Sequence, residues 1–164
     1  MDIFTVVILI ATLLCALVAG FLLAFAVVVM PGIKTFSDYD FLKSFKVMDK
    51  VIQDNSPSFM IVWAGSVLTL LIAVVMAFFQ LDGVNLILVV AAAGLYMFGV
   101  QLPTGVVNVP LNNALQKKDL DAESEEDLSQ SRIAFEARWV KWNSVRTVVS
   151  IVTALILIVV MLRL

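Results

Sequence analysis

The polar residues best suited to chemistry form two groups on either side of a hydrophilic stretch in the second half of the chain. The first group holds two asparagines four residues apart. The second holds two tryptophans, an asparagine and an arginine at steps of three, four and seven, which is the spacing of one helical face. Amides and guanidinium groups donate hydrogen bonds, and indole rings stack on flat molecules. This combination predicts a pocket for an anionic or quinone-like oxygen, lined by Asn108, Asn112, Trp139, Trp142, Asn143 and Arg146.

The same six residues also fit a purely structural role. Asparagine side chains cap helix ends, arginine reaches toward lipid headgroups, and tryptophan prefers the membrane interface. Polar groups at membrane depth are costly unless they find partners, so these residues are expected to converge in either case. Spacing alone slightly favours the structural interpretation, and both stay open.

The counts of histidine and cysteine exclude several kinds of catalytic site. The chain has no histidine and a single cysteine, Cys15. This rules out histidine-ligated haem, His-rich copper or di-iron sites, a Ser-His-Asp triad and cysteine clusters for zinc or iron–sulfur. The acidic stretch 119–127 is expected to be a solvated loop rather than a metal site. We therefore expect no cofactor and no metal ion, and the catalytic residues stay unknown at this stage.

Long apolar stretches must hold these polar groups in place. The sequence is 62% hydrophobic, against roughly 45–50% in soluble proteins. A helix of about 20 apolar residues crosses the hydrocarbon layer of a bilayer. Three long uncharged stretches thus predict spans at about 3–30, 58–81 and 84–111. A shorter uncharged stretch, 147–162, predicts a fourth span at about 142–163 when it is extended backward through Arg146. The predicted fold is an all-α, four-helix transmembrane bundle that forms a single integral membrane domain over residues 1–164.

The distribution of positive charge predicts how this bundle is oriented. Ten of the eleven Lys and Arg residues lie in two segments, 34–50 and 117–146, which four spans place on one side of the membrane. Because positive charge is retained in cytoplasmic loops, both loops are expected in the cytoplasm and both termini outside. The expected partners are membrane lipid and either a second copy of the chain or another membrane protein. Nucleic acid is not expected as a partner.

The hydrophilic segments are expected to form two surface helices. Apolar residues recur at 41, 45, 48 and 52, while Lys43, Lys46, Asp49 and Lys50 occupy much of the remainder. This pattern predicts an amphipathic surface helix in the first cytoplasmic loop. A second surface helix is expected to lead into the fourth span.

The third span contains a weak stretch of helix. Pro103 stands among glycines and polar residues, which predicts a kink or an unwound turn. Irregular backbone at membrane depth must be buried in protein or line a cavity. Residues 101–108 are therefore the first place in which we expect a pocket.

Several segments together resemble the anthrone-oxygenase-like family of small four-span membrane proteins, many of whose members are bacterial. The matching segments are 30–32, 47–66, 95–96, 108–115 (NVPLNNAL) and 139–147 (WVKWNSVRT). The fourth and fifth are the more specific, and the first is weak. Relatives commonly carry histidine where this chain has Ser144. The resemblance implies a location in the bacterial inner membrane.

The resemblance also implies a function. Fungal members are associated with the oxidation of anthrones to anthraquinones without a metal or flavin. An anthrone has an acidic carbon and a carbonyl, and its enolate reacts with dioxygen. A protein then needs to bind a flat apolar ring and stabilise an oxyanion. The hypothesis is a cofactor-independent oxygenase with an apolar aromatic ligand, with Tyr96 a weak candidate for the base. The alternative is a non-enzymatic membrane scaffold or accessory subunit.

Overall fold

Four long apolar helices and one shorter amphipathic helix make up the protein. The computed structural model describes residues 2–54 and 56–164. Within these residues all regular structure is helical, which confirms the predicted all-α class. The segments long and apolar enough to cross a membrane are Ile3–Ile33, Pro57–Gln80, Gly83–Gln116 and Glu125–Met161. The chain is an integral membrane protein built as a four-helix bundle.

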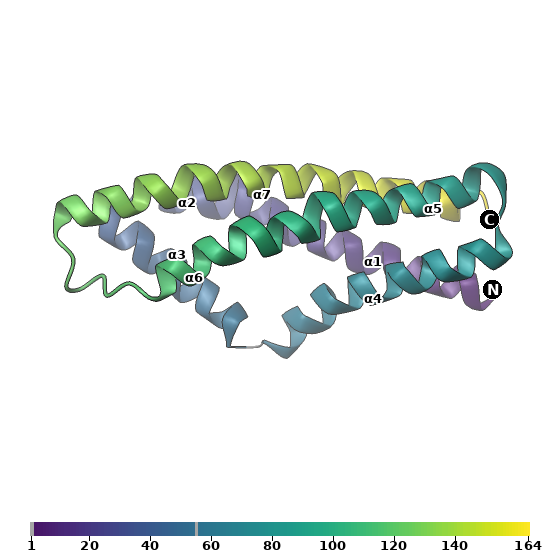
Figure 1. Ribbon diagram of the computed structural model, residues 1–164, viewed down its shortest axis with the longest axis horizontal. Coiled ribbons are helices and arrows are strands. Elements are labelled where there is room, and N and C mark those ends of the chain that lie inside the picture. The colour runs from purple at the N-terminus through teal and green to yellow at the C-terminus, as the bar shows by residue number, and fades with distance from the viewer. Residues whose placement is uncertain (1, 55) are drawn as a thin grey trace.

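The long helices run side by side along the length of the molecule and are connected at its two ends (Figure 1). Both termini lie at one end of the bundle, and α3 and the amino-terminal part of α7 lie at the other. The first and third segments contain π-helical turns, labelled η. The elements are α1 (Ile3–Ala24), η1 (Phe25–Val29), α2 (Met30–Ile33), α3 (Asp38–Gln53), α4 (Pro57–Gln80), α5 (Gly83–Tyr96), η2 (Met97–Gln101), η3 (Thr104–Asn108), α6 (Val109–Gln116) and α7 (Glu125–Met161).

Local sequence explains where the helices begin. The side-chain oxygen of Ser37 accepts from the backbone N–H of Asp40 at the start of α3, and Ser124 caps α7 by accepting from the N–H of Asp127. These bonds satisfy backbone donors that have no partner within the helix. Pro57 stands in the first turn of α4, where a missing N–H costs nothing. Gly83 has φ +49° at the start of α5, a conformation that favours glycine.

Each of the three π-helical turns ends two residues before a proline. Pro31 follows η1, Pro103 follows η2 and Pro110 follows η3. Proline lacks an N–H, and its ring clashes with the carbonyl four residues earlier. The helix responds by widening for one turn, so that the residue before each proline bonds the carbonyl five residues back. The third span is thus widened near Pro103 rather than unwound.

The spans pack around α1 and α7, which lie side by side. The helix α4 packs on α1, and α5 packs on α7. At Gly99 in η2 the approach is so close that a Cβ atom would lie 2.6 Å from Cγ1 of Val149 in α7. Only 17% of the residues in an apolar 18-residue stretch of α4 are buried within the chain, so most of the apolar surface there is left to lipid or to a partner.

The two segments predicted to be surface helices, α3 and the amino-terminal part of α7, pack against each other. The apolar side of α3 buries Phe41, Leu42 and Phe45 in a cluster that includes Phe135 and Trp139 of α7. Arg132 of α7 pins the start of α3 by donating to Asp38 Oδ1 (2.9 Å) and to the carbonyl oxygens of Lys34 and Phe36. The segment expected to lead into the fourth span is the amino-terminal part of α7 itself, which runs unbroken for 37 residues.

Candidate functional site

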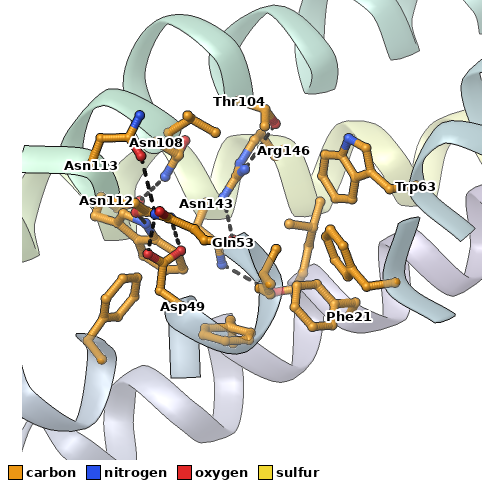
Figure 2. A pocket seen from close by; sticks show the side chains of 17 residues that line it. Phe21, Asp49, Gln53, Trp63, Thr104, Asn108, Asn112, Asn113, Asn143 and Arg146 are labelled. Atoms are coloured by element: carbon orange, nitrogen blue, oxygen red, sulfur yellow. Dashed lines mark hydrogen bonds between the residues drawn. The ribbon is translucent and has the colours of Figure 1, made fainter. Parts of the chain in front are cut away.

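A pocket of about 310 Å³ lies where α3, α4 and α6 converge on α1 and α7 (Figure 2). Its lining combines a set of aromatic side chains, called the aromatic wall here, with a set of polar side chains, called the polar wall. The aromatic wall consists of Phe21, Phe25, Phe45, Phe59, Trp63 and Trp139. The polar wall consists of Asp49, Gln53, Thr104, Asn108, Asn112, Asn113, Asn143 and Arg146. Gln53 and Asn113 are exposed to solvent, so the pocket reaches the protein surface beside them.

The aromatic wall is a continuous set of ring contacts. Phe59 stacks on Trp63 with ring centroids 5.4 Å apart and planes at 21°. Phe21 lies between Phe59 and Phe25, with ring centroids 5.3 Å and 5.1 Å away, respectively. Phe25 in turn lies 5.7 Å from Trp139. Such a wall offers flat apolar surfaces against which an aromatic ligand can pack.

Three hydrogen bonds hold Arg146 and Asn143 in place in the polar wall. Arg146 donates from Nη1 to Thr104 Oγ1 and from Nη2 to Asn143 Oδ1, both at 3.0 Å. Asn143 donates from Nδ2 to the carbonyl oxygen of Leu22 at 3.1 Å. Because arginine only donates, the Asn143 amide has one orientation that satisfies both bonds. The guanidinium is therefore held between α1, η3 and α7, and it also lies 5.8 Å from the centre of the Trp139 ring.

Asp49 lies at another part of the polar wall and is 4% exposed. Its Oδ1 accepts from Asn112 Nδ2 at 2.7 Å. Its Oδ2 accepts from Gln53 Nε2 at 2.7 Å and from Gln116 Nε2 at 2.9 Å. Four ion pairs are present among the described residues, and Asp49 takes part in none of them. The carboxylate is thus held by neutral amides alone.

Two buried polar atoms that belong to lining residues have no protein partner. They are Oδ1 of Asn108, whose side chain is 2% exposed, and Nε of Arg146, which is 4% exposed. One is an acceptor and the other a donor. Buried polar groups are nearly always bonded, so these two atoms are candidates to bond a ligand or a water molecule.

Comparison with known proteins identifies the family. The sequence model described as Anthrone oxygenase matches residues 45–156. The chain belongs to the anthrone oxygenase family. No curated protein and no solved structure matches the chain. The part of the pocket that the anthrone oxygenase match covers includes all of the polar wall, whereas Phe21 and Phe25 lie outside it.

The structure brings five of the six predicted residues to the pocket of this anthrone oxygenase family member. The five are Asn108, Asn112, Trp139, Asn143 and Arg146. Trp142 is half-buried and is not among the lining residues. It lies about 60° around the helix from Trp139, on the side away from Asn143, because successive residues turn by about 100°.

Two other residues singled out from the sequence also lie elsewhere. Tyr96 is buried among the spans, where its hydroxyl bonds Ser66 Oγ at 2.7 Å, and it does not line the pocket. Ser144 is exposed, and its hydroxyl donates to the carbonyl oxygen of Val140 at 3.0 Å. Position 144, where the family resemblance implies histidine, is thus outside the pocket lining of this chain.

Sequence reasoning missed Asp49, which it assigned to the polar side of the surface helix. Asp49 follows Phe45 by four residues and Phe41 by eight, so it lies on the buried apolar side of α3. The sequence did contain a signal for this residue, namely a carboxylate at a position where the helical pattern expects a buried apolar side chain. Sequence reasoning also missed Trp63, which lines the pocket and whose Nε1 donates to Gln101 Oε1 at 3.1 Å.

The carboxylate at position 49 does not form part of a metal cluster. Among the residues that the structure describes, no three His, Cys, Asp or Glu side chains lie together in a way that could hold a metal ion. The polar groups that line the pocket are amides, a guanidinium, a hydroxyl, indoles and one carboxylate.

Proposed function

We propose that the pocket binds a flat, apolar aromatic molecule that carries a carbonyl oxygen, and that the protein oxidises this molecule with dioxygen. The observation that carries the proposal is one cavity whose lining combines six aromatic side chains with two residues that have unpartnered buried polar atoms. Membership of the anthrone oxygenase family makes an anthrone the substrate class to test first.

The size and shape of the pocket suit such a ligand. At about 310 Å³ it stands near the lower end of ligand pockets, which span about 300–1,000 Å³. A compact tricyclic molecule is better matched to this volume than a long lipid. The Phe59–Trp63 pair and Trp139 offer ring faces for stacking.

The polar wall can hold the oxygen end of the ligand. The N–H at Arg146 Nε is free to donate to a carbonyl oxygen, and this bond strengthens when the oxygen gains negative charge. Asn108 Oδ1 is free to accept from a phenolic hydroxyl on the same ligand. The other two nitrogens of Arg146 are occupied by Thr104 and Asn143, so the guanidinium is already oriented before the ligand binds.

The proposed overall reaction is balanced without a further reductant. One anthrone and one dioxygen give one anthraquinone and one water. The methylene carbon of the substrate supplies all the electrons and both hydrogens that appear in the water. One oxygen atom becomes the new carbonyl of the product.

The experiment that tests this function uses the purified protein in detergent, with anthrone as substrate and anthraquinone as a ligand. The wild-type protein is expected to accelerate oxygen uptake and to quench its tryptophan fluorescence on binding anthraquinone. Arg146→Ala should weaken binding and oxidation, and Arg138→Ala is the matched control because Arg138 is exposed outside the pocket. A wild-type protein with no effect on anthrone would reject the oxygenase function.

A second candidate is a membrane scaffold whose polar cluster is structural. The observation in its favour is that the bonds of Arg146 and Asn143 tie α7 to α1 and η3. In that case anthraquinone should leave the melting temperature of the protein unchanged. Under the oxygenase proposal it should raise the melting temperature of the wild type but not of Arg146→Ala.

We also propose that the hydrophilic end of the bundle faces the cytoplasm of a bacterial cell and that the termini face outward across the inner membrane. The concentration of Lys and Arg in 34–50 and 117–146 supports this orientation. A membrane-impermeant maleimide should label Asp82→Cys in intact cells, but Lys118→Cys only after lysis. The native Cys15 is fully buried and gives little background.

A further inference from the structure

Asp49 is the single carboxylate among the described residues that line the pocket. We propose that Asp49 is the general base that takes the proton from the acidic carbon of the substrate. This inference rests on the proposed oxygenase function and adds the group that would start the reaction.

The three amide donors leave one acceptor position on Asp49. A carboxylate offers about four lone-pair sites, two on each oxygen. Gln53 and Gln116 both donate to Oδ2, whereas Asn112 alone donates to Oδ1. Oδ1 therefore keeps one lone pair for a proton from outside the network, and the residue lines the pocket in which the ligand would lie.

The network fixes the direction of these donors. Trp139 Nε1 donates to Asn112 Oδ1 at 2.9 Å, and an indole nitrogen can only donate. The amide of Asn112 must therefore turn its nitrogen toward Asp49. Gln116 Nε2 is likewise held by the carbonyl oxygen of Lys46 at 2.8 Å, and Gln53 Nε2 by Asn113 Oδ1 at 3.2 Å. The carboxylate is positioned without a cation that would compete for its charge.

A buried carboxylate held in this way calls for a reason beyond packing. Aspartate is almost never fully buried unless it is paired, and burying charge is costly. An apolar residue at position 49 would continue the buried stripe of Phe41 and Phe45 without that cost. A proton-accepting role gives a reason for a carboxylate here, whereas anchoring α3 does not require one.

Asp49 and Arg146 would meet different edges of a bound anthrone. The two side chains lie apart on the polar wall in Figure 2. In an anthrone the acidic methylene and the carbonyl are on opposite edges of the central ring. A base at one edge and an oxyanion donor at the other would both reach the substrate in a single orientation.

The proposed step is balanced in atoms and electrons. A C–H bond of the methylene breaks, its proton moves to Asp49 Oδ1, and its electron pair passes through the ring to the carbonyl oxygen, where Arg146 Nε–H donates to the charge. The enolate carbon then forms a bond to dioxygen, and Asp49 returns its proton to the outer oxygen of the peroxide. Loss of the second methylene proton to Asp49 breaks the O–O bond and forms the new carbonyl. The departing hydroxide takes that proton and leaves as water.

The test compares Asp49→Asn with wild type in two assays, and Asp54→Asn is the control because Asp54 is exposed at the end of the same helix. Anthraquinone has no acidic methylene, so Asp49→Asn should still bind it. Anthrone oxidation should fall by about a hundredfold or more, the usual contribution of a general base. The deficit should shrink at high pH, where anthrone ionises in solution, and a structural role alone would not give this pH dependence.

The outcomes separate the two proposals. If the wild type does not oxidise anthrone, the oxygenase function fails and the base fails with it. If the wild type is active and Asp49→Asn binds anthraquinone and stays nearly as active, only the base is overturned. If Asp49→Asn no longer binds anthraquinone, the deciding variant is Asp49→Ala with added formate. Rescue of oxidation by formate supports the base, and no rescue overturns it.

Discussion

Arg146 and Asn143 stand one turn apart on α7 and are joined by a bond of 3.0 Å from Nη2 to Oδ1. The same amide donates to the carbonyl oxygen of Leu22 on α1. Asn143 therefore has two tasks: it orients the guanidinium toward the pocket, and it ties α7 to α1. The two tasks can be separated by measuring ligand binding and stability on the same variants.

Asn143→Ala should lower both the stability of the protein and its affinity for the ligand. The change leaves one guanidinium nitrogen of Arg146 without its acceptor, which costs about 1–3 kcal/mol when nothing replaces the bond. It also removes the side-chain donor to the Leu22 carbonyl, which keeps its bond from the Phe25 N–H. Thermal unfolding in detergent measures the stability, and titration with anthraquinone measures the affinity. Ser144→Ala is the control, because Ser144 is the next residue on the helix but is exposed. Equal melting temperatures for the two variants would contradict the assigned bonds.

Trp139→Phe should affect turnover more than binding. Phenylalanine keeps an aromatic ring in the wall but removes the N–H that fixes Asn112, which then no longer has to direct its nitrogen to Asp49. We expect a stability loss of about 1 kcal/mol, typical of one hydrogen bond, and a larger fall in kcat than rise in KM. Steady-state oxygen uptake with anthrone gives both constants.

The matched control for that variant is Trp142→Phe. Trp142 is half-buried outside the pocket lining, so the change should leave kcat and KM close to those of wild type. If Trp142→Phe lowers kcat as much as Trp139→Phe does, the pocket has been assigned to the wrong side of α7.

Gly99→Ala should destabilise the bundle because η2 and α7 approach too closely for a side chain. The new Cβ would lie 2.6 Å from Val149 Cγ1, and overpacking of this kind costs about 1–3 kcal/mol. Gly94→Ala, where a Cβ meets nothing within 4 Å, should be neutral or slightly stabilising. The double variant Gly99→Ala with Val149→Ala should recover much of the loss. Unfolding midpoints that are equal for Gly99→Ala and Gly94→Ala would show that the helices are farther apart.

Much of the fold could be predicted because membrane spans have a strong signature. Three long uncharged stretches and a shorter fourth allow few structures other than four helices. Pro103 predicted an irregular turn in the third span, but its π-helical form and the similar turns before Pro31 and Pro110 were not predicted. The positions of Asn108 and Arg146 followed from the same reasoning, since polar residues at the ends of spans must find partners. These features depend on composition and local sequence alone.

The aromatic wall could not be predicted in the same way. Phe21 and Phe25 stand in a span that is apolar all round, where periodicity does not separate a side that faces lipid from one that faces a pocket. Asp49 was hidden for another reason: it belongs to a helix rich in lysine, and its burial depends on how α3 docks on α6 and α7. Docking of this kind is a tertiary property.

Ser144→His should have little effect on function, although the family resemblance implies histidine at this position. Ser144 is exposed, bonds its own helix at Val140 and is not among the pocket-lining residues, so an imidazole there would not reach a ligand bound between the two walls. We expect the rate of anthrone oxidation and the affinity for anthraquinone to change by less than about twofold, as for other surface substitutions. Oxygen uptake and fluorescence titration measure the two quantities. A gain of tenfold or more, on the order of the effect of an added acid or base, would mean that position 144 faces the substrate.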